Sequence, residues 1–99
     1  MDMDALMAQA NALQTKVAAA QEKLASMHVK GIADSGACII DMTGKYDLAD
    51  IKISADALAR GPDVVAALVV AAYNDAKAKA DELIDRVMGD ATAGIPLGE

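Results

Sequence analysis

Aromatic residues are almost absent from this chain of 99 residues. Phe and Trp do not occur, and aromatics make up 2% of the sequence, although hydrophobic residues make up 55%. The core must therefore be built from Ala, Val, Leu, Ile and Met, of which Ala especially buries little apolar area. Because a chain of this length buries only about 60–70% of its unfolded surface, we expect one small domain, residues 1–90, that gains core area from a partner chain.

Cysteine and long apolar runs are also scarce. Cys38 is the only cysteine and has no intramolecular disulfide partner. Together with the lack of a basic, apolar leader with a cleavage site, this favours a reducing cytoplasm. The longest nearly apolar run, residues 64–73, has ten residues, about half of the roughly 20 that a membrane-spanning helix needs. We expect no membrane contact.

The residue patterns of catalytic and metal sites are missing. A structural zinc site needs about four Cys or His ligands, and the chain offers only His28 and Cys38. We expect His28 to end the first helix, where a cation is favourable, and Cys38 to be a buried apolar residue. A small hydrolase using Cys38 or Ser35 lacks an orienting group, and no phosphate-binding glycine motif occurs. The sequence therefore predicts no catalysis, metal, cofactor or small-molecule substrate.

Residues 2–27 contain neither Gly nor Pro and predict one long helix. Its apolar positions alternate three and four apart over more than three heptads, as in a coiled-coil seam. The seam consists of Met3, Leu6, Ala10, Leu13, Val17, Ala20, Leu24 and Met27. Two alternatives stay open: the helix lies on the sheet of its own chain, or it packs against a helix across a dimer.

Residues 29–54 change to the period of short strands separated by turns. Strands are expected at 29–33, 37–43 and 48–54, with turns at 34–36 and 44–47. In the third strand, Ala49, Ile51 and Ile53 alternate with polar residues, so one face is expected to be buried. The pattern predicts a three-stranded antiparallel meander whose apolar face must be covered.

A second long helix is expected from Pro62 to Met88, after a short helical turn capped by Ser54 and with Gly89 as its end. Its first half is apolar on nearly all sides, more than one small sheet can cover. The fold class is therefore α+β, a two-layer protomer in a tight homodimer, with an irregular, mobile tail at 91–99. The interface is expected at Val65, Leu68, Val69, Ala72 and Tyr73.

Positive charge is scarce. Nine Lys and Arg residues face 15 Asp and Glu residues, giving a net charge of −6. This field repels phosphate backbones from the molecule as a whole, so any nucleic-acid contact must come from a local cluster of bases. Three bases of the second helix have an acid four positions away and are expected to form surface ion pairs. These pairs are Asp75–Lys79, Lys77–Asp81 and Glu82–Arg86.

The order helix, meander, helix, together with several short motifs, resembles the YbaB/EbfC family of bacterial nucleoid-associated proteins. The motifs are the Gln/Met/Lys-rich segment 7–23 and the segments 29–31, 35–36, 51–53, 68–76 and 94–98, with Leu58 after the third strand. The resemblance implies a small α+β homodimer in the bacterial cytoplasm that binds DNA and coats the nucleoid, without cofactor or catalysis.

Five other lysines are the candidates for DNA contact. Lys16 and Lys23 are seven apart on one edge of the first helix, and Lys30 follows just beyond it. Lys45 lies in a turn and Lys52 on the polar face of the third strand. A few phosphate contacts give non-specific binding with a Kd of about 10⁻⁴–10⁻⁶ M, and no recognition helix appears. The leading hypothesis is non-specific binding of double-stranded DNA; the alternative is an acidic dimer that has lost DNA affinity and binds a protein.

Overall fold

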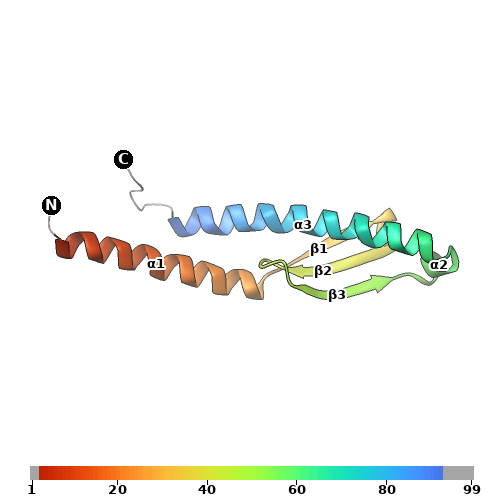
Figure 1. Ribbon diagram of the computed structural model, residues 1–99, viewed down its shortest axis with the longest axis horizontal. Helices are drawn as coiled ribbons and strands as arrows, with labels where there is room; N and C mark the ends of the chain where they lie inside the picture. The colour runs from red at the N-terminus through yellow and green to blue at the C-terminus, as the bar shows by residue number, and fades with distance from the viewer. Residues whose placement is uncertain (1–2, 93–99) are drawn as a thin grey trace.

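The computed structural model describes residues 3–92 and has the predicted α+β fold (Figure 1). The molecule is elongated, 67 × 22 × 16 Å. A long helix leads into a three-stranded sheet, and a second long helix returns along it. The elements are α1 Met3–Ser26, β1 His28–Ala33, the 3₁₀ turn η1 Asp34–Gly36, β2 Cys38–Thr43, β3 Leu48–Ile53, α2 Ala55–Ala59 and α3 Pro62–Thr92.

The sheet is an antiparallel meander in the order β1-β2-β3, as predicted. The turn between β1 and β2 passes through three consecutive residues with positive φ, Asp34 (50°), Ser35 (56°) and Gly36 (105°). Asp and Gly adopt this region more readily than most residues, which explains why the sequence marks the turn so clearly. The register pairs Gly31 with Ile40 and Ile40 with Ile51, so these three residues share one face of the sheet.

The core lies between that face and α3. On β2, Cys38, Ile40 and Met42 are at most 1% exposed. On α3, the residues that meet the sheet are small and four apart: Ala72, Ala76 and Ala80, each fully buried. Small side chains at this spacing let the sheet approach the helix closely. Of the predicted inward positions Ala76, Ala80, Leu83, Ile84 and Val87, all are buried except Ile84, which is half-buried.

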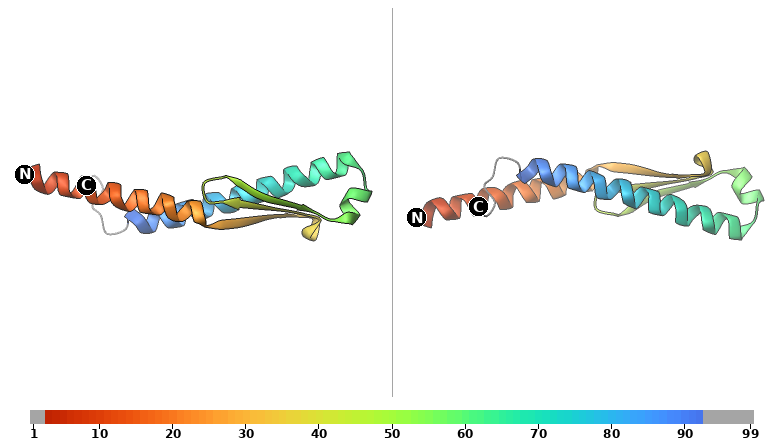
Figure 2. Two further views of the ribbon diagram at one scale, coloured as in Figure 1. Left: turned by 90° about the horizontal axis from the view of Figure 1, so that it is seen from below. Right: turned by 90° about the horizontal axis from the view of Figure 1, so that it is seen from above.

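The prediction that β3 buries one face is not met within a single chain. α3 lies over β1 and β2 and leaves the equivalent face of β3 uncovered (Figure 2). Ile53 is half-buried against the core, whereas Ala49 is exposed and Ile51 is 39% exposed. Leu48, at the start of the strand, is 50% exposed. One helix is too narrow to cover a three-stranded sheet.

α1 packs mainly against α3 and touches the sheet only near its own C-terminal end. It runs antiparallel to the C-terminal half of α3 in the same chain (Figure 1). Ala20 and Leu24 of α1 form a small core with Leu83 and Val87 of α3. The N-terminal part of α1 projects beyond the end of α3 in every view (Figures 1 and 2). The first half of the predicted heptad seam is therefore exposed.

Two predicted helix ends were wrong. α3 continues through Gly89 to Thr92, because a single glycine costs a helix only about 1 kcal/mol relative to alanine and α3 has its neighbour α1 to pack on. Ala91 and Thr92 thus belong to α3, and the rest of the predicted tail lies outside the described residues. α1 ends at Ser26, and His28 is the first residue of β1 instead of a helix cap.

Side chains of α3 cover the free edge of β1. The Asp75 carboxylate accepts a hydrogen bond from the Ile32 backbone N–H (2.9 Å). Lys79 pairs with Asp75 (3.0 Å) and donates to the Lys30 carbonyl (2.7 Å). The two side chains therefore satisfy a donor and an acceptor that would otherwise offer an edge for strand pairing. The predicted Asp75–Lys79 pair is confirmed, with a second role on the sheet.

This contact predicts an acid-dependent loss of stability. The Ile32 N–H, and after it Lys79, lower the pKa of the Asp75 carboxyl below its usual value of 3.8. The unfolded chain therefore binds the Asp75 proton more tightly than the folded protein does. The stabilisation is complete at pH values above the pKa that Asp75 has in the unfolded chain. It is lost as the pH falls from about 5 through the folded-state pKa. In urea unfolding at a series of pH values, Asp75→Asn should be less stable than the parent protein near neutrality, and the difference should shrink with acidification. A constant difference would contradict the assignment.

Candidate nucleic-acid interface

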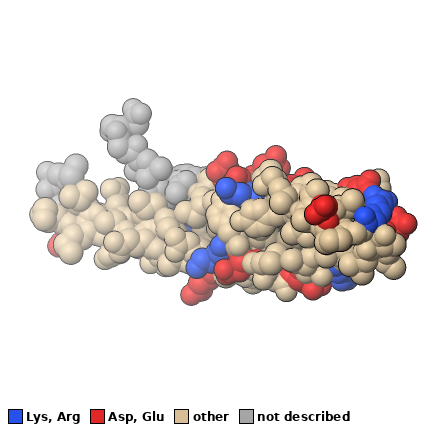
Figure 3. Space-filling model, turned by 45° about the vertical axis from the view of Figure 1, so that its right-hand side comes forward, with Lys and Arg blue, Asp and Glu red and all other residues tan. Residues whose placement is uncertain are grey.

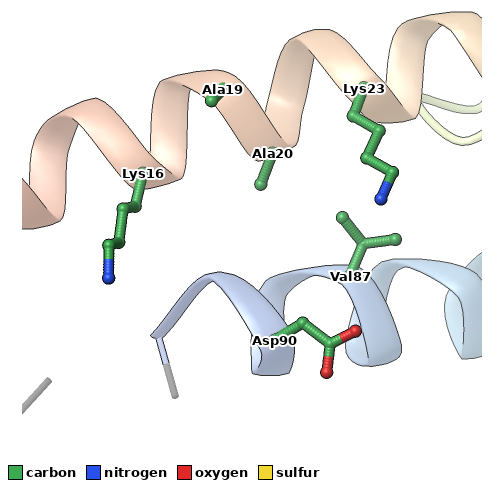
Figure 4. Close-up of a pocket in the computed structure, with 6 residues that line it drawn as sticks. All are labelled: Lys16, Ala19, Ala20, Lys23, Val87 and Asp90. Atoms are coloured by element: carbon green, nitrogen blue, oxygen red, sulfur yellow. The ribbon is translucent and has the colours of Figure 1, made fainter. Parts of the chain in front are cut away.

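Lys16 and Lys23 line a groove between the two long helices. Its volume is about 290 Å³, and its walls are Lys16, Ala19, Ala20 and Lys23 of α1 with Val87 and Asp90 of α3. Figure 4 shows both lysine side chains leaving α1 on the side of α3, with Lys23 directed toward Val87. The seven-residue spacing of the two lysines places them two turns apart on one side of α1. Two positive charges thus face one negative charge across an apolar floor.

Lys30 and Lys52 lie elsewhere, on the outer face of the sheet. They line a shallow hollow of about 70 Å³ with Ile39, Asp41 and Asp50. Asp41 stands opposite Lys30 on one neighbouring strand and opposite Asp50 on the other. The Asp41 carboxylate also accepts a hydrogen bond from His28 Nδ1 (2.7 Å). The lysines of this surface are therefore matched by an equal number of carboxylates.

Lys45 occupies a third place, in the hairpin between β2 and β3. It borders an apolar hollow of about 360 Å³ formed with Gln21 and Leu24 of α1 and Ile84 and Met88 of α3. The neighbouring Tyr46 hydroxyl bonds to the Asp81 carboxylate of α3 and so holds the hairpin against that helix. This hydrogen bond raises the pKa of the Tyr46 phenol. Asp81 is thereby engaged by the hairpin instead of the predicted partner Lys77.

The structure separates the predicted stripe of bases. Lys16 and Lys23 share the groove, whereas Lys30 belongs to the sheet surface with Lys52. Within residues 3–92, ion pairs are found for Lys79 and for Arg60, which bridges Asp34 (2.9 Å) and Asp56 (2.7 Å), but for none of the five candidate lysines. In Figure 3 acidic residues outnumber basic ones on the visible face, so no broad positive surface is seen there.

No residue cluster suited to catalysis or metal binding is found in the described part of the chain. Residues 3–92 contain no group of three or more His, Cys, Asp or Glu residues placed to hold a metal ion. Burial raises the pKa of the Cys38 thiol, which disfavours the reactive thiolate. Cys38 faces the core, and His28 is bonded to Asp41 on the outer face of the sheet. Among the helices of residues 3–92, none is sufficiently long and apolar to cross a membrane.

The predicted interface residues have different environments in the single chain. Ala72 is fully buried, and Leu68 and Val69 pack against the same core. Val65 is half-buried, and only Tyr73 is open, with 42% exposure. Val70, which the interface prediction does not include, is 60% exposed. Helical periodicity relates it to Tyr73, because the two residues are three apart and lie to one side of the Ala72–Ala76–Ala80 row.

Comparison with known proteins identifies the family. The model of the YbaB/EbfC DNA-binding family matches residues 1–95. The chain belongs to this family. It is 39% identical over 93 residues to a nucleoid-associated protein of Rhodospirillum rubrum, covering 93% of this chain and 87% of that one. It is 43% identical over 94 residues to a nucleoid-associated protein of Gluconobacter oxydans, with the same two coverages.

A solved structure has the same fold. The crystal structure of an uncharacterized protein from Helicobacter pylori superposes with a TM-score of 0.79, covering 91% of this chain and 96% of that one. The two sequences are only 17% identical. The α+β arrangement of this YbaB/EbfC member is therefore shared by a protein whose sequence has diverged widely.

Proposed function

We propose that this chain is a non-enzymatic, nucleoid-associated protein of the bacterial cytoplasm that binds double-stranded DNA as a homodimer with little sequence preference. The family, described as DNA-binding, and the nucleoid-associated relatives support the class of ligand. The observation that carries the proposal within this structure is the groove that holds Lys16 and Lys23. Lysines that are in excess over the acids around them are the groups expected to contact phosphates.

The groove is the better of the two basic surfaces. Lys16 and Lys23 share their groove with a single acid, Asp90, so positive charge is in excess there. Lys30 and Lys52 share their hollow with two carboxylates, which balance the two positive charges. Phosphate contact needs a local excess of positive charge in a chain whose net charge is −6. No helix of the described residues is rich in bases, so contact with the DNA backbone, without base reading, is the expected mode.

The uncovered apolar surface beside α3 supports the proposed homodimer. Asp75 and Lys79 hold one flank of α3 against β1, so Val70 and Tyr73, on the opposite flank, lie toward β3. Leu48 and Ile51 of β3 are exposed as well. These four residues, here called the β3–α3 patch, are 39–60% exposed in the single chain. A second copy packed on this patch would bury it and would double the number of grooves.

Salt-dependent binding tests the choice of surface. Fluorescence anisotropy of a labelled duplex should show binding that weakens steeply with salt. In Lys16→Ala/Lys23→Ala, affinity should fall and the slope of log K against log salt should become shallower by about 0.9 for each phosphate that the variant no longer neutralises. The matched comparison is Lys30→Ala/Lys52→Ala, which removes the same charge from the sheet surface and should change the slope less.

The outcomes distinguish the hypotheses. A larger effect of the Lys30/Lys52 pair would move the contact to the sheet. Absence of binding by the parent protein even at about 50 mM salt, where phosphate contacts are strongest, would favour the alternative of an acidic dimer that binds a protein.

A further inference from the structure

The exposed N-terminal part of α1 carries almost no charge, although the protein as a whole is acidic. Residues 3–12, here called the arm, are all exposed and contain a single charged residue, Asp4. Met3 is 66%, Leu6 45% and Met7 58% exposed. Figure 3 shows this end of the molecule almost without red or blue, while the body carries many charges. An exposed apolar strip of this kind marks an interaction surface.

The arm continues an interface that already exists. Met3, Leu6 and Ala10 occupy the same heptad positions as Ala20 and Leu24, which pack against α3. The seam thus passes without a break from a part covered by a helix to a part that extends beyond the end of that helix (Figures 1 and 2). Because a heptad seam packs against another helix, we expect a helix to cover the exposed part of the seam.

The arm sequence is complementary to itself when two copies run antiparallel. A register centred on residue 8 pairs Leu6 with Ala10 of the second copy and Ala10 with Leu6, a large residue opposite a small one at both places. The same register pairs Met3 with Leu13. Met7 and the neutral Gln9 then flank the twofold axis, so no like charges oppose one another. Elsewhere, two copies of a chain with net charge −6 repel each other.

We propose that the arms of two molecules pair antiparallel, tip to tip, and thereby link homodimers. This step rests on the proposed function in one respect: where each dimer binds DNA, linked dimers hold two duplexes together. The contact is small, since the arm supplies three seam residues per chain, Met3, Leu6 and Ala10, and Leu13 follows directly after it. An interface well below about 1,200 Å² gives weak, concentration-dependent association, which is promoted when dimers gather on one DNA molecule.

Sedimentation without DNA tests the pairing. Between about 10 and about 500 μM, the range suited to such a small interface, the weight-average mass of the parent protein should rise above that of the dimer. Leu6→Glu places a charge in the seam and should keep the mass at that of the dimer. The matched control is Ala8→Glu, which adds the same charge on the opposite side of the same helical turns and should behave as the parent does.

Capture of a second, labelled duplex by an immobilised one tests the consequence. Leu6→Glu should reduce capture about 10-fold or more, with affinity for a single duplex equal to that of Ala8→Glu. Equal masses for the two variants, or a parent mass that does not rise, would overturn the pairing. If the Leu6→Glu protein were a monomer, the arm would belong to the interface of the homodimer itself. If association appeared only after removal of residues 93–99, that segment would be identified as the one that covers the arm. If the masses behave as expected but no duplex is bound, the proposed function fails and the pairing stands.

Discussion

Replacing Gly31 by Ala is expected to destabilise the protein by at least about 3 kcal/mol, the upper range for overpacking a core. A Cβ atom at position 31 would lie 2.0 Å from the carbonyl oxygen of Ala72 and 2.5 Å from the backbone nitrogen of Ala76. Backbone atoms of a helix cannot move aside as a flexible side chain can. β1 would have to separate from α3, and the hydrogen bonds of Asp75 and Lys79 to the strand would break with it.

The measurement is the free energy of unfolding in urea at one fixed protein concentration, because association contributes to apparent stability. Gly89→Ala is the matched control. Among the described residues, no heavy atom apart from the neighbouring residues and the backbone of the same helix lies within 4 Å of a Cβ at position 89, and this glycine is inside α3. The control should therefore be more stable than the parent by about 0.5–1 kcal/mol. If the two variants had similar stabilities, the close approach of β1 to α3 would be wrong.

The contact at Gly31 illustrates what the sequence could and could not predict. The order of elements and most boundaries were predicted because helix and strand periods, turn residues and caps are local features. The contact of Gly31 with α3 joins residues that are more than 40 positions apart in the sequence. A single sequence has no local signal for such a contact. A glycine within a strand, together with alanines spaced by four on a helix, is nevertheless typical of close backbone approach.

The candidate site was predicted less completely than the fold. The seven-residue spacing placed Lys16 and Lys23 on one side of α1 correctly. Lys30 continues their line in the sequence, but the chain turns after Ser26, and strand alternation carries Lys30 to the outer face of the sheet. Similarly, the sequence showed the heptad seam of α1 but did not show which element packs against it. Periodicity shows that a helix has an apolar side, and only the tertiary arrangement shows that α3 covers half of it.

The single chain shows which side of α3 the sheet covers and which side it leaves exposed. The first half of α3 is apolar on nearly all sides, and the sheet covers the side of Leu68, Val69 and Ala72. The adjacent side, with Val70 and Tyr73, remains exposed. A helix wheel cannot tell which of two apolar sides meets the sheet, since both satisfy the same pattern.

Val70→Glu is therefore expected to break the homodimer and, with it, most of the DNA affinity. Val70 is the most exposed residue of the β3–α3 patch, at 60%, and a carboxylate there would be buried without a partner in the interface. The dimer Kd should rise about 100-fold or more, equivalent to about 2.8 kcal/mol. A single chain offers one groove instead of two, so affinity for a long duplex should fall about 10-fold or more as bivalent attachment is lost.

Sedimentation and duplex anisotropy on the same samples separate these effects from a general effect of charge. Ala78→Glu makes the same charge change on an exposed position of α3 that lies away from β3, and it should remain dimeric and retain DNA affinity close to that of the parent. A dimeric Val70→Glu protein would place the interface on another surface. A monomeric protein with unchanged DNA affinity would show that one Lys16–Lys23 groove suffices. The expected loss of both properties requires that the dimer brings two grooves onto one duplex.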